Sequence, residues 1–125
     1  LTDLRTLLQT ADVVSLHVPM TPETHHLLDA AMIAELKPGA VVINAARGGV
    51  LDEEALIAAL KSGQLGGAAL DVFETEPLTA EAGRRFAGLG NVILTPHIAG
   101  MAEESNVRVS QVTAENVRSV LKGEA

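Results

Sequence analysis

One stretch decides the fold class of this chain: VVINAARGGVL, residues Val41–Leu51. An apolar run leads into Arg47, two glycines follow, and Asp52 then opens an amphipathic helix. This order is typical of a buried parallel strand whose carboxyl end brings an arginine to a crevice, which is where open α/β sheets bind ligands. The guanidinium group is a planar, permanently charged fork suited to a carboxylate. The stretch therefore predicts an anion site at the end of a strand.

The composition agrees with a parallel sheet covered by helices. The chain has 125 residues, of which 47% are hydrophobic and 20% charged, so it carries enough apolar material for one core. Trp and Tyr are absent, so the core is expected to consist of Val, Leu, Ile and Ala, as in parallel sheets with helices on their faces.

Charge and residue content argue against several classes of function. The net charge of −7 disfavours nucleic acid or an anionic membrane as a partner. The absence of cysteine excludes disulfides and thiolate chemistry. His25 and His26 are adjacent, so their side chains are expected to point apart, and no metal site is expected. Neither a membrane-spanning run nor a signal peptide is recognisable, which predicts a cytoplasmic location.

Apolar runs alternate with helical patterns along the chain. The runs predict four strands, at Val13–Val18, Val41–Ala45, Gly67–Val72 and Asn91–Thr95. Spacing and capping signals predict four helices: Leu4–Ala11, a helix capped by Thr21 and stopped by Pro38, a helix capped by Asp52 and ended by Gly63, and Met101–Lys122. Glu76–Gly90 is expected to be a loop. Strands and helices that alternate in this way predict an α/β fold with about four parallel strands.

Polar side chains follow each predicted strand. They are His17, Arg47, Asp71 and His97. Because the carboxyl ends of parallel strands lie at one edge of the sheet, these four side chains are expected to converge there.

His97 and a further acidic residue, Glu76, suggest proton transfer at this edge. His97 lies in a segment stiffened by Pro96, and Glu76 follows the neighbouring strand. A carboxylate beside an imidazole stabilises the protonated ring and makes a proton shuttle that works near neutrality. An arginine that binds a carboxylate and polarises the adjacent carbonyl completes the set. Together these groups suit interconversion of a 2-hydroxy acid and a 2-oxo acid, with hydride passing to or from a nicotinamide.

Each residue taken alone has a simpler interpretation. A strand-end arginine is often a surface ion-pair partner of little energetic weight. A lone histidine is more often structural than catalytic, and Asp71 is able to cap the turn that follows it. Only the combination favours a functional site.

The chain also resembles the D-isomer-specific 2-hydroxyacid dehydrogenase family, which includes phosphoglycerate dehydrogenases, hydroxypyruvate reductases and D-lactate dehydrogenases. The resemblance covers nearly the whole chain, in the family's order. Its segments are Ala11–Pro19 (ADVVSLHVP), Thr21–Leu28 (TPETHHLL), Leu36–Leu51 (LKPGAVVINAARGGVL), Gly67–Pro77 (GAALDVFETEP) and Asn91–Gly100 (NVILTPHIAG).

The resemblance implies roles for particular residues. Arg47 would bind the carboxylate and oxo group of a small 2-hydroxy or 2-oxo acid, His97 would be the catalytic acid/base, and Glu76 its partner. Asp71 would hold the nicotinamide carboxamide. The implied cofactor is NAD, with NADP not excluded, and the remaining residues beside it would be Val18, Pro19, Ala45, Ala46, Arg47, His97 and Gly100.

The resemblance also implies a domain organisation. The family's phosphate loop, G-x-G-x-x-G, and the acidic residue after its second strand are not found in this sequence. Residues 1–100 are therefore expected to be the carboxyl-terminal half of a Rossmann-like dinucleotide-binding domain, and residues 101–125 a long helix leading back toward a substrate domain. The whole protein is expected to be a homo-oligomer, such as a homodimer.

Two alternative functions stay open. One is a binding-only protein on the same scaffold, like the corepressors that resemble this family, but the presence of Arg47, Glu76 and His97 argues against it. The other is a structural fragment that is inactive alone, because the pyrophosphate site and half of the crevice are absent. We expect the isolated chain to be oligomeric or poorly stable, since the strand Val13–Val18 leaves an apolar sheet edge bare.

Overall fold

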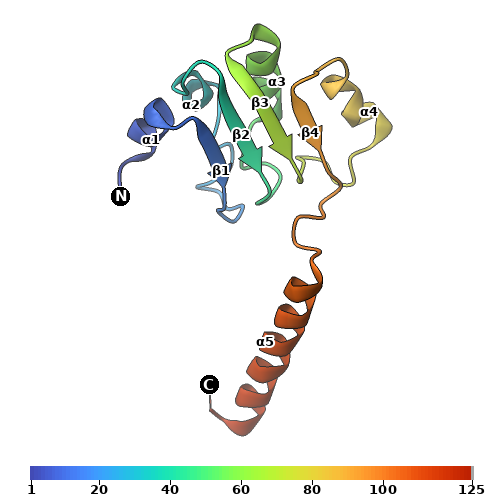
Figure 1. The fold of residues 1–125 in the computed structure, drawn as a ribbon. Helices are drawn as coiled ribbons and strands as arrows, with labels where there is room; N and C mark the ends of the chain where they lie inside the picture. The colour runs from blue at the N-terminus through green and yellow to red at the C-terminus, as the bar shows by residue number, and fades with distance from the viewer. Residues whose placement is uncertain (125) are drawn as a thin grey trace.

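A computed structural model describes residues 1–124 of the chain. Figure 1 shows a sheet with helices behind it and one long helix that projects away from the sheet. The elements in chain order are α1 (Leu4–Thr10), β1 (Val13–Leu16), α2 (Ala30–Ala34), β2 (Ala40–Asn44), α3 (Glu53–Ser62), β3 (Leu65–Leu70), α4 (Ala80–Gly83), η1 (Arg84–Phe86), β4 (Val92–Leu94) and α5 (Glu103–Lys122).

Within the described residues the four strands form one parallel sheet, in the order β1-β2-β3-β4. The register pairs Leu16 with Asn44, Asn44 with Leu70, and Leu70 with Leu94. Each of these residues is the last of its strand, so the four carboxyl ends lie level at one edge. The α/β fold with four parallel strands that the sequence predicted is confirmed.

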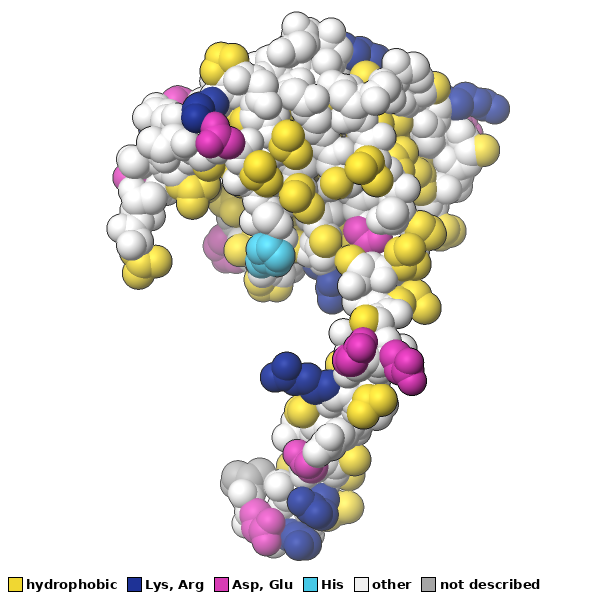
Figure 2. Space-filling view, viewed as in Figure 1, with side chains coloured by type: hydrophobic (Ala, Val, Ile, Leu, Met, Phe, Trp, Pro, Cys, Tyr) yellow, Lys and Arg dark blue, Asp and Glu magenta, His cyan; other side chains and the backbone are white. Residues whose placement is uncertain are grey.

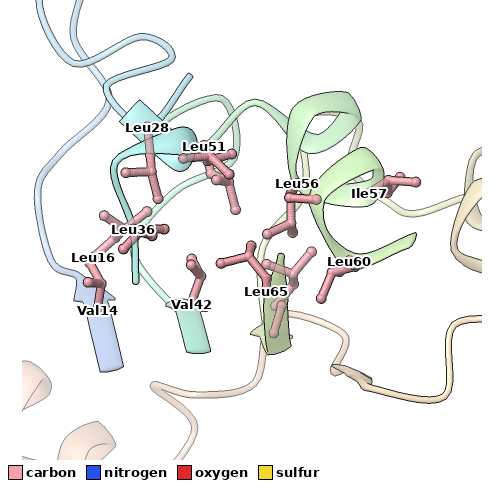
Figure 3. Packing of buried hydrophobic residues seen from close by; sticks show 14 of the residues in the cluster. Val14, Leu16, Leu28, Leu36, Val42, Leu51, Leu56, Ile57, Leu60 and Leu65 are labelled. Carbon is pink, nitrogen blue, oxygen red and sulfur yellow. The ribbon is translucent and has the colours of Figure 1, made fainter. Parts of the chain in front are cut away.

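One face of the sheet is covered and the other is largely open. Val14, Leu16 and Val42 are buried against residues of the helices and of the loops between them, as Figure 3 shows. On the opposite face Val13 and Ile93 are 55% and 66% exposed, and Figure 2 shows hydrophobic side chains spread across this side. Since burying a side chain of this size stabilises a fold by about 1.5–3 kcal/mol, the covered face contributes most of the core energy.

Helix α3 agrees with the sequence prediction at both ends. The side chain of Asp52 accepts a 3.0 Å hydrogen bond from the Ala55 N–H, which satisfies one of the free donors of the first turn. Gly63 ends the helix in a left-handed conformation, with φ of 77°, which glycine adopts without steric cost. The helix therefore starts at a fixed point just after the loop that carries Arg47.

The helix predicted to begin at Thr21 is wrong in its start. It begins at Ala30, where Asp29 is the N-cap. The turn that starts at Thr21 does not continue, because His26 adopts a left-handed φ of 48° and its N–H donates to the Gly49 carbonyl at 2.7 Å. This hydrogen bond pairs the backbone at His26 with the loop between β2 and α3. A tertiary hydrogen bond thus overrides a local capping signal.

The segment Glu76–Gly90, predicted as a loop, contains two short helices, α4 and η1. Thr79 caps α4 by accepting a hydrogen bond from the Ala82 N–H, and Phe86 is buried, with 4% exposed. Buried Phe86 fixes this short segment to the core. The apolar periodicity of such brief turns is too short to indicate them in the sequence.

The strand boundaries also differ from the prediction. β3 begins two residues before the predicted start, because Gly66 lets the chain pass close to the turn before β2: a Cβ at Gly66 would lie 2.4 Å from the Gly39 carbonyl oxygen. β1 ends at Leu16 rather than Val18, and β4 spans three residues. Shifts of one or two residues at strand ends are expected where the backbone turns into loops.

Helix α5 stands apart from the rest of the chain (Figure 1), and none of its residues is buried. It starts two residues after the predicted Met101, at Glu103. Its exposed apolar side chains include Val109, Val112 and Leu121. No helix among residues 1–124 is long and apolar enough to cross a membrane.

Candidate active site

His97 and Glu76 form a hydrogen-bonded pair at the carboxyl edge of the sheet. Nδ1 of His97 lies 2.8 Å from Oε2 of Glu76, and Oε1 of Glu76 accepts a 2.9 Å hydrogen bond from the Phe73 N–H. The hydrogen bond to His97, followed by that from Phe73, holds the pKa of Glu76 below its ordinary value of 4.5. Glu76 is therefore a carboxylate at neutral pH, beside an imidazole that is half exposed.

The backbone of His97 has an unusual conformation. Its φ is 55°, in the left-handed region, where an L-residue other than glycine meets a cost of about 1–2 kcal/mol. Histidine is one of the residue types that tolerate this region best. The N–H of His97 donates to the Asp71 carbonyl at 2.8 Å, so the strained residue is held by a neighbouring strand end.

Asp71 holds the segment that follows β4. Its Oδ1 accepts a hydrogen bond from the Ile98 N–H at 2.9 Å and its Oδ2 accepts one from the Ala99 N–H at 2.8 Å, while the Thr95 hydroxyl also donates to Oδ1. Burial raises the pKa of Asp71, but these hydrogen bonds outweigh burial and leave the pKa below its ordinary value of 3.8. These hydrogen bonds connect the end of β3 to the segment after the neighbouring strand β4, which contains His97.

Arg47 is positioned by Asn44, a residue for which no role was predicted from the sequence. Asn44 is buried, accepts a 3.1 Å hydrogen bond from the Ala46 N–H and donates one of 3.1 Å to the Arg47 carbonyl. The Arg47 side chain is exposed, and its Nη1 donates to the Ala46 carbonyl at 2.6 Å. The position of Asn44, a polar residue at the end of an otherwise apolar strand, was the sequence signal that could have indicated this structural role.

The surface ion-pair interpretation of Arg47 finds no support. Arg5 pairs with Glu35 and Lys37 with Asp12, whereas no carboxylate within residues 1–124 pairs with Arg47. Its charge faces a hollow and remains available to an anion.

Most of the predicted residues line three hollows along the carboxyl edge. The first has a volume of about 530 Å³ and contains the predicted cofactor residues Val18, Pro19, Ala45 and Ala46, together with Arg47, His17 and Met20. The second, of about 380 Å³, is lined by Glu76 and His97, and the third, of about 210 Å³, by Asp71, Ala45, Thr95 and Ala99 among others. Volumes of a few hundred Å³ are typical of small-molecule sites.

The structure does not bring all the predicted residues into one hollow. Arg47 lines the first hollow, whereas the His97–Glu76 pair lines the second, and Gly100 lines none of the three. His17 is in the first hollow, with its Nε2 2.8 Å from the Ser15 hydroxyl.

The residues around the third hollow fit a carboxamide such as that of nicotinamide. A carboxylate offers about four acceptor positions. Thr95 and Ile98 donate to Oδ1 of Asp71 and Ala99 donates to Oδ2, so Oδ2 retains a position for one more N–H donor. Asp71 is only 6% exposed and lines the hollow, so a group bound there would be close enough to supply that donor.

His25 and His26 correct one expectation. Their rings do not point apart but stack, with centroids 4.0 Å apart, because the left-handed backbone of His26 turns the second ring beside the first. In the part of the chain that the structure describes, no group of three or more His, Cys, Asp or Glu side chains is arranged to hold a metal ion.

Comparison with known proteins decides the family. Residues 1–99 match the sequence model of the "D-isomer specific 2-hydroxyacid dehydrogenase, NAD binding domain" family. The chain belongs to this family. The nicotinamide cofactor expected from the sequence agrees with the family description.

Relatives of the family resemble this chain closely but are longer. It is 54% identical over 118 residues to the (S)-sulfolactate dehydrogenase of Chromohalobacter salexigens, which covers 94% of this chain and 38% of that protein. The D-lactate dehydrogenase of Aquifex aeolicus, solved with NAD and lactic acid, superposes with a TM-score of 0.84 at 38% identity, covering 98% of this chain and 41% of that one.

A family member from Xanthobacter autotrophicus, solved with NADPH and MES, gives a TM-score of 0.85 at 43% identity, covering 98% of this chain and 49% of that one. The Rossmann-like assignment of the sheet is thereby confirmed. The chain spans less than half the length of each of these relatives.

Proposed function

We propose that this chain is the nicotinamide-side part of an NAD(P)-dependent dehydrogenase that interconverts a small 2-hydroxy acid and the corresponding 2-oxo acid. The observation that carries the proposal is the hydrogen bond between His97 and Glu76 at the carboxyl edge of the sheet. A carboxylate that orients an exposed imidazole is an arrangement suited to general acid/base catalysis near neutral pH.

The geometry assigns atoms to the proton transfer. Nδ1 of His97 faces Glu76, so Nε2 is the nitrogen left to exchange a proton with the substrate oxygen. A bound nicotinamide would supply hydride to the carbonyl carbon of a 2-oxo acid, and Nε2 of His97 would donate the proton to the carbonyl oxygen. Glu76 stays ionised and stabilises the imidazolium.

Arg47 is proposed to bind the substrate carboxylate. Its guanidinium has no carboxylate partner within the described residues and lines the largest of the three hollows. A bidentate fork on a carboxylate also places the neighbouring carbonyl oxygen near a positive charge, which polarises it for hydride attack.

The cofactor is proposed to lie along the first and third hollows. Val18, Pro19, Ala45 and Ala46 would contact it in the first, and Asp71 would accept a hydrogen bond from the carboxamide in the third. Gly100 follows the segment that Asp71 anchors and is proposed to lie beside the cofactor in the whole protein. The relatives solved with NAD and with NADPH support either dinucleotide.

The domain organisation is also a proposal. Residues 1–100 would form the carboxyl-terminal half of the dinucleotide-binding domain, and residues 101–125 the helix leading toward a substrate domain. The exposed apolar side chains of α5 and its separation from the sheet in Figure 1 support this. The 125-residue chain alone is proposed to be inactive, and the whole protein to be a homo-oligomer. The cytoplasmic location stays a prediction.

The test uses the full-length protein and a panel of 2-oxo acids, with oxidation of NADH and NADPH followed by absorbance. We expect turnover in the wild type and its loss in His97→Ala, with NADH binding retained. His25→Ala is the matched control, because it removes an exposed histidine outside the three hollows. A wild-type protein that binds NADH yet turns over none of the acids would instead support a binding-only role.

A further inference from the structure

Two loops at the carboxyl edge hold each other through a reciprocal pair of hydrogen bonds. Oε1 of Glu53 accepts a 2.7 Å hydrogen bond from the Glu74 N–H, and Oε1 of Glu74 accepts a 3.1 Å hydrogen bond from the Glu53 N–H. Glu53 is the first residue of α3, directly after the loop that carries Arg47, and Glu74 lies in the loop that carries Glu76. We call this arrangement the Glu53–Glu74 clamp.

Glu53 is an unusual residue for a helix start because it is buried. Its side chain is 3% exposed, and its second oxygen pairs with the Arg85 guanidinium. Burial raises the pKa of Glu53, against the opposing effects of the Glu74 N–H and of Arg85. An acid at this position needs only the helix N-terminus as a partner, so its burial against another loop calls for a separate explanation.

A second contact joins the same two loops. A Cβ atom at Gly48 would lie 1.8 Å from the Phe73 carbonyl oxygen, so the backbones meet without room for a side chain. Phe73 in turn donates its N–H to Glu76. The residue beside Arg47 therefore touches the residue that anchors Glu76, and the clamp joins the neighbouring residue of the same loop, Glu74, to the start of α3.

A contact with His26 also helps to hold the Glu74 side chain in place. Nε2 of His26 lies 3.2 Å from Oε1 of Glu74, the oxygen that accepts the Glu53 N–H. His26 is held in its left-handed conformation by the Gly49 carbonyl, in the same loop as Arg47. Three connections thus run from the Arg47 loop to the Glu76 loop.

We propose that Glu53 and Glu74 are positioning residues of the active site, which set the separation between Arg47 and the His97–Glu76 pair. Arg47 and His97 line different hollows, so their relative placement depends on the loops that carry them. The inference rests on the proposed function, because it assigns Arg47 and His97 to one reaction. Neither glutamate is expected to touch the substrate.

The test compares Glu53→Ala and Glu74→Ala with Glu54→Gln in the full-length protein. Glu54 is the matched control: it lies in the same helical turn and its side chain also contacts Arg85, at 3.0 Å, but it is 73% exposed and has no hydrogen bond to the Glu76 loop within residues 1–124. Glu53→Gln is the conservative variant: its amide oxygen still accepts the Glu74 N–H, and only the position that faces Arg85 changes from an acceptor to an NH2 group. We measure kcat, KM, the Kd for NADH, the melting temperature and the imidazole NMR signals of His97.

We expect kcat to fall by about 10- to 100-fold in Glu53→Ala and Glu74→Ala, because small displacements of reacting groups carry penalties of this size. The Kd for NADH should stay near that of the wild type, the His97 imidazole signals should move, and Glu53→Gln should restore most of kcat. Glu54→Gln should match the wild type in each measurement. Glu74 is partly exposed, so its variant keeps the test valid if Glu53→Ala does not fold.

Two results would overturn the inference. One is a lower melting temperature in both alanine variants with unchanged kcat and unchanged His97 signals. The other is an equal loss in Glu54→Gln, which would assign the effect to Arg85 rather than to the clamp. If the wild type lacks dehydrogenase activity, the proposed function fails, whereas the His97 signals of the variants still decide whether the clamp positions this residue.

Discussion

Nδ1 of His97 and Oε2 of Glu76 lie 2.8 Å apart, although the two residues are 21 positions apart in the chain and follow different strands. The pair exists because β3 and β4 are parallel neighbours whose ends are level. This hydrogen bond holds the pKa of Glu76 below its ordinary value, so a full negative charge lies beside the His97 ring at neutral pH.

Glu76→Gln should therefore change the pH dependence of the reaction in both directions. Reduction needs a protonated His97, and the amide no longer stabilises the imidazolium. The alkaline limb of kcat/KM for reduction should move to lower pH, and the acid limb for oxidation should move the same way. Glu81→Gln, an exposed acid outside the site, is the control. Profiles that coincide with the wild type in both directions would show that Glu76 is not the partner of His97.

Arg47→Lys should separate substrate binding from cofactor binding. Lysine keeps the charge but loses the bidentate fork. We expect kcat/KM to fall by about 100-fold, since an imperfectly paired anion costs on the order of 3 kcal/mol. The Kd for NADH, measured by fluorescence, should change little. An equal loss of NADH affinity would make Arg47 a cofactor residue instead.

Gly48→Ala should disturb the contact between the Arg47 and Glu76 loops. The added Cβ would overlap the Phe73 carbonyl, so one backbone must shift, at a cost of about 1–3 kcal/mol in unfolding free energy. Gly90→Ala is the control, because a Cβ there meets nothing within 4 Å. Urea unfolding of both variants gives the comparison, and equal midpoints would contradict the close approach.

Asp71→Asn should destabilise the fold at neutral pH and much less in acid. The amide offers one acceptor fewer to Thr95, Ile98 and Ala99, and we expect a loss of about 2 kcal/mol at pH 7. The folded pKa of Asp71 lies below its ordinary value of 3.8, so its contribution is complete above that value and disappears as the pH falls further.

Urea unfolding of wild type and Asp71→Asn at pH 7 and pH 3 checks the sign of this effect. The difference between the two proteins should shrink at the lower pH. Asp12→Asn, with an 83% exposed carboxylate, should match the wild type throughout. A difference that persists undiminished at pH 3 would refute the assignment.

The 125-residue chain in isolation should self-associate. Its sheet has one largely open face and two unpaired edges, where Val13 and Ile93 are exposed. Sedimentation velocity should show a mass that rises with concentration. Val13→Lys combined with Ile93→Lys should reduce the association, because charged residues on edge strands oppose pairing. A wild-type chain that stays monomeric with a high, cooperative melting transition would contradict the prediction.

The sequence predicted the features that depend on short-range patterns. Apolar runs marked the four strands, and Asp52 and Gly63 marked both ends of α3, because strand burial and helix capping depend on neighbouring residues. The convergence of Asp71 and His97 followed from the parallel topology alone. The pairing of His97 with Glu76 was suggested by their positions after neighbouring strands and implied by the family resemblance, and the structure shows the two side chains in contact.

The features that depend on distant contacts were not predictable in this way. Thr21 carried a sound capping signal, but a hydrogen bond from His26 to a loop more than twenty residues away ended the turn. The clamp between Glu53 and Glu74 could not be predicted either, because in the sequence Glu53 is indistinguishable from an ordinary exposed acid in a first helical turn. Only the placement of the two loops shows why this acid is buried.

The left-handed backbone of His97 limits which residues can replace it. A β-branched residue at this position meets a steric penalty before any chemistry is considered, whereas glycine, asparagine and aspartate accept the conformation. Asparagine keeps a hydrogen-bonding side chain but has no group that gains or loses a proton near neutral pH. A descendant of this protein that binds the dinucleotide without turning over substrate is therefore expected to carry asparagine, aspartate or glycine here, since these changes remove the proton transfer and leave the loop intact.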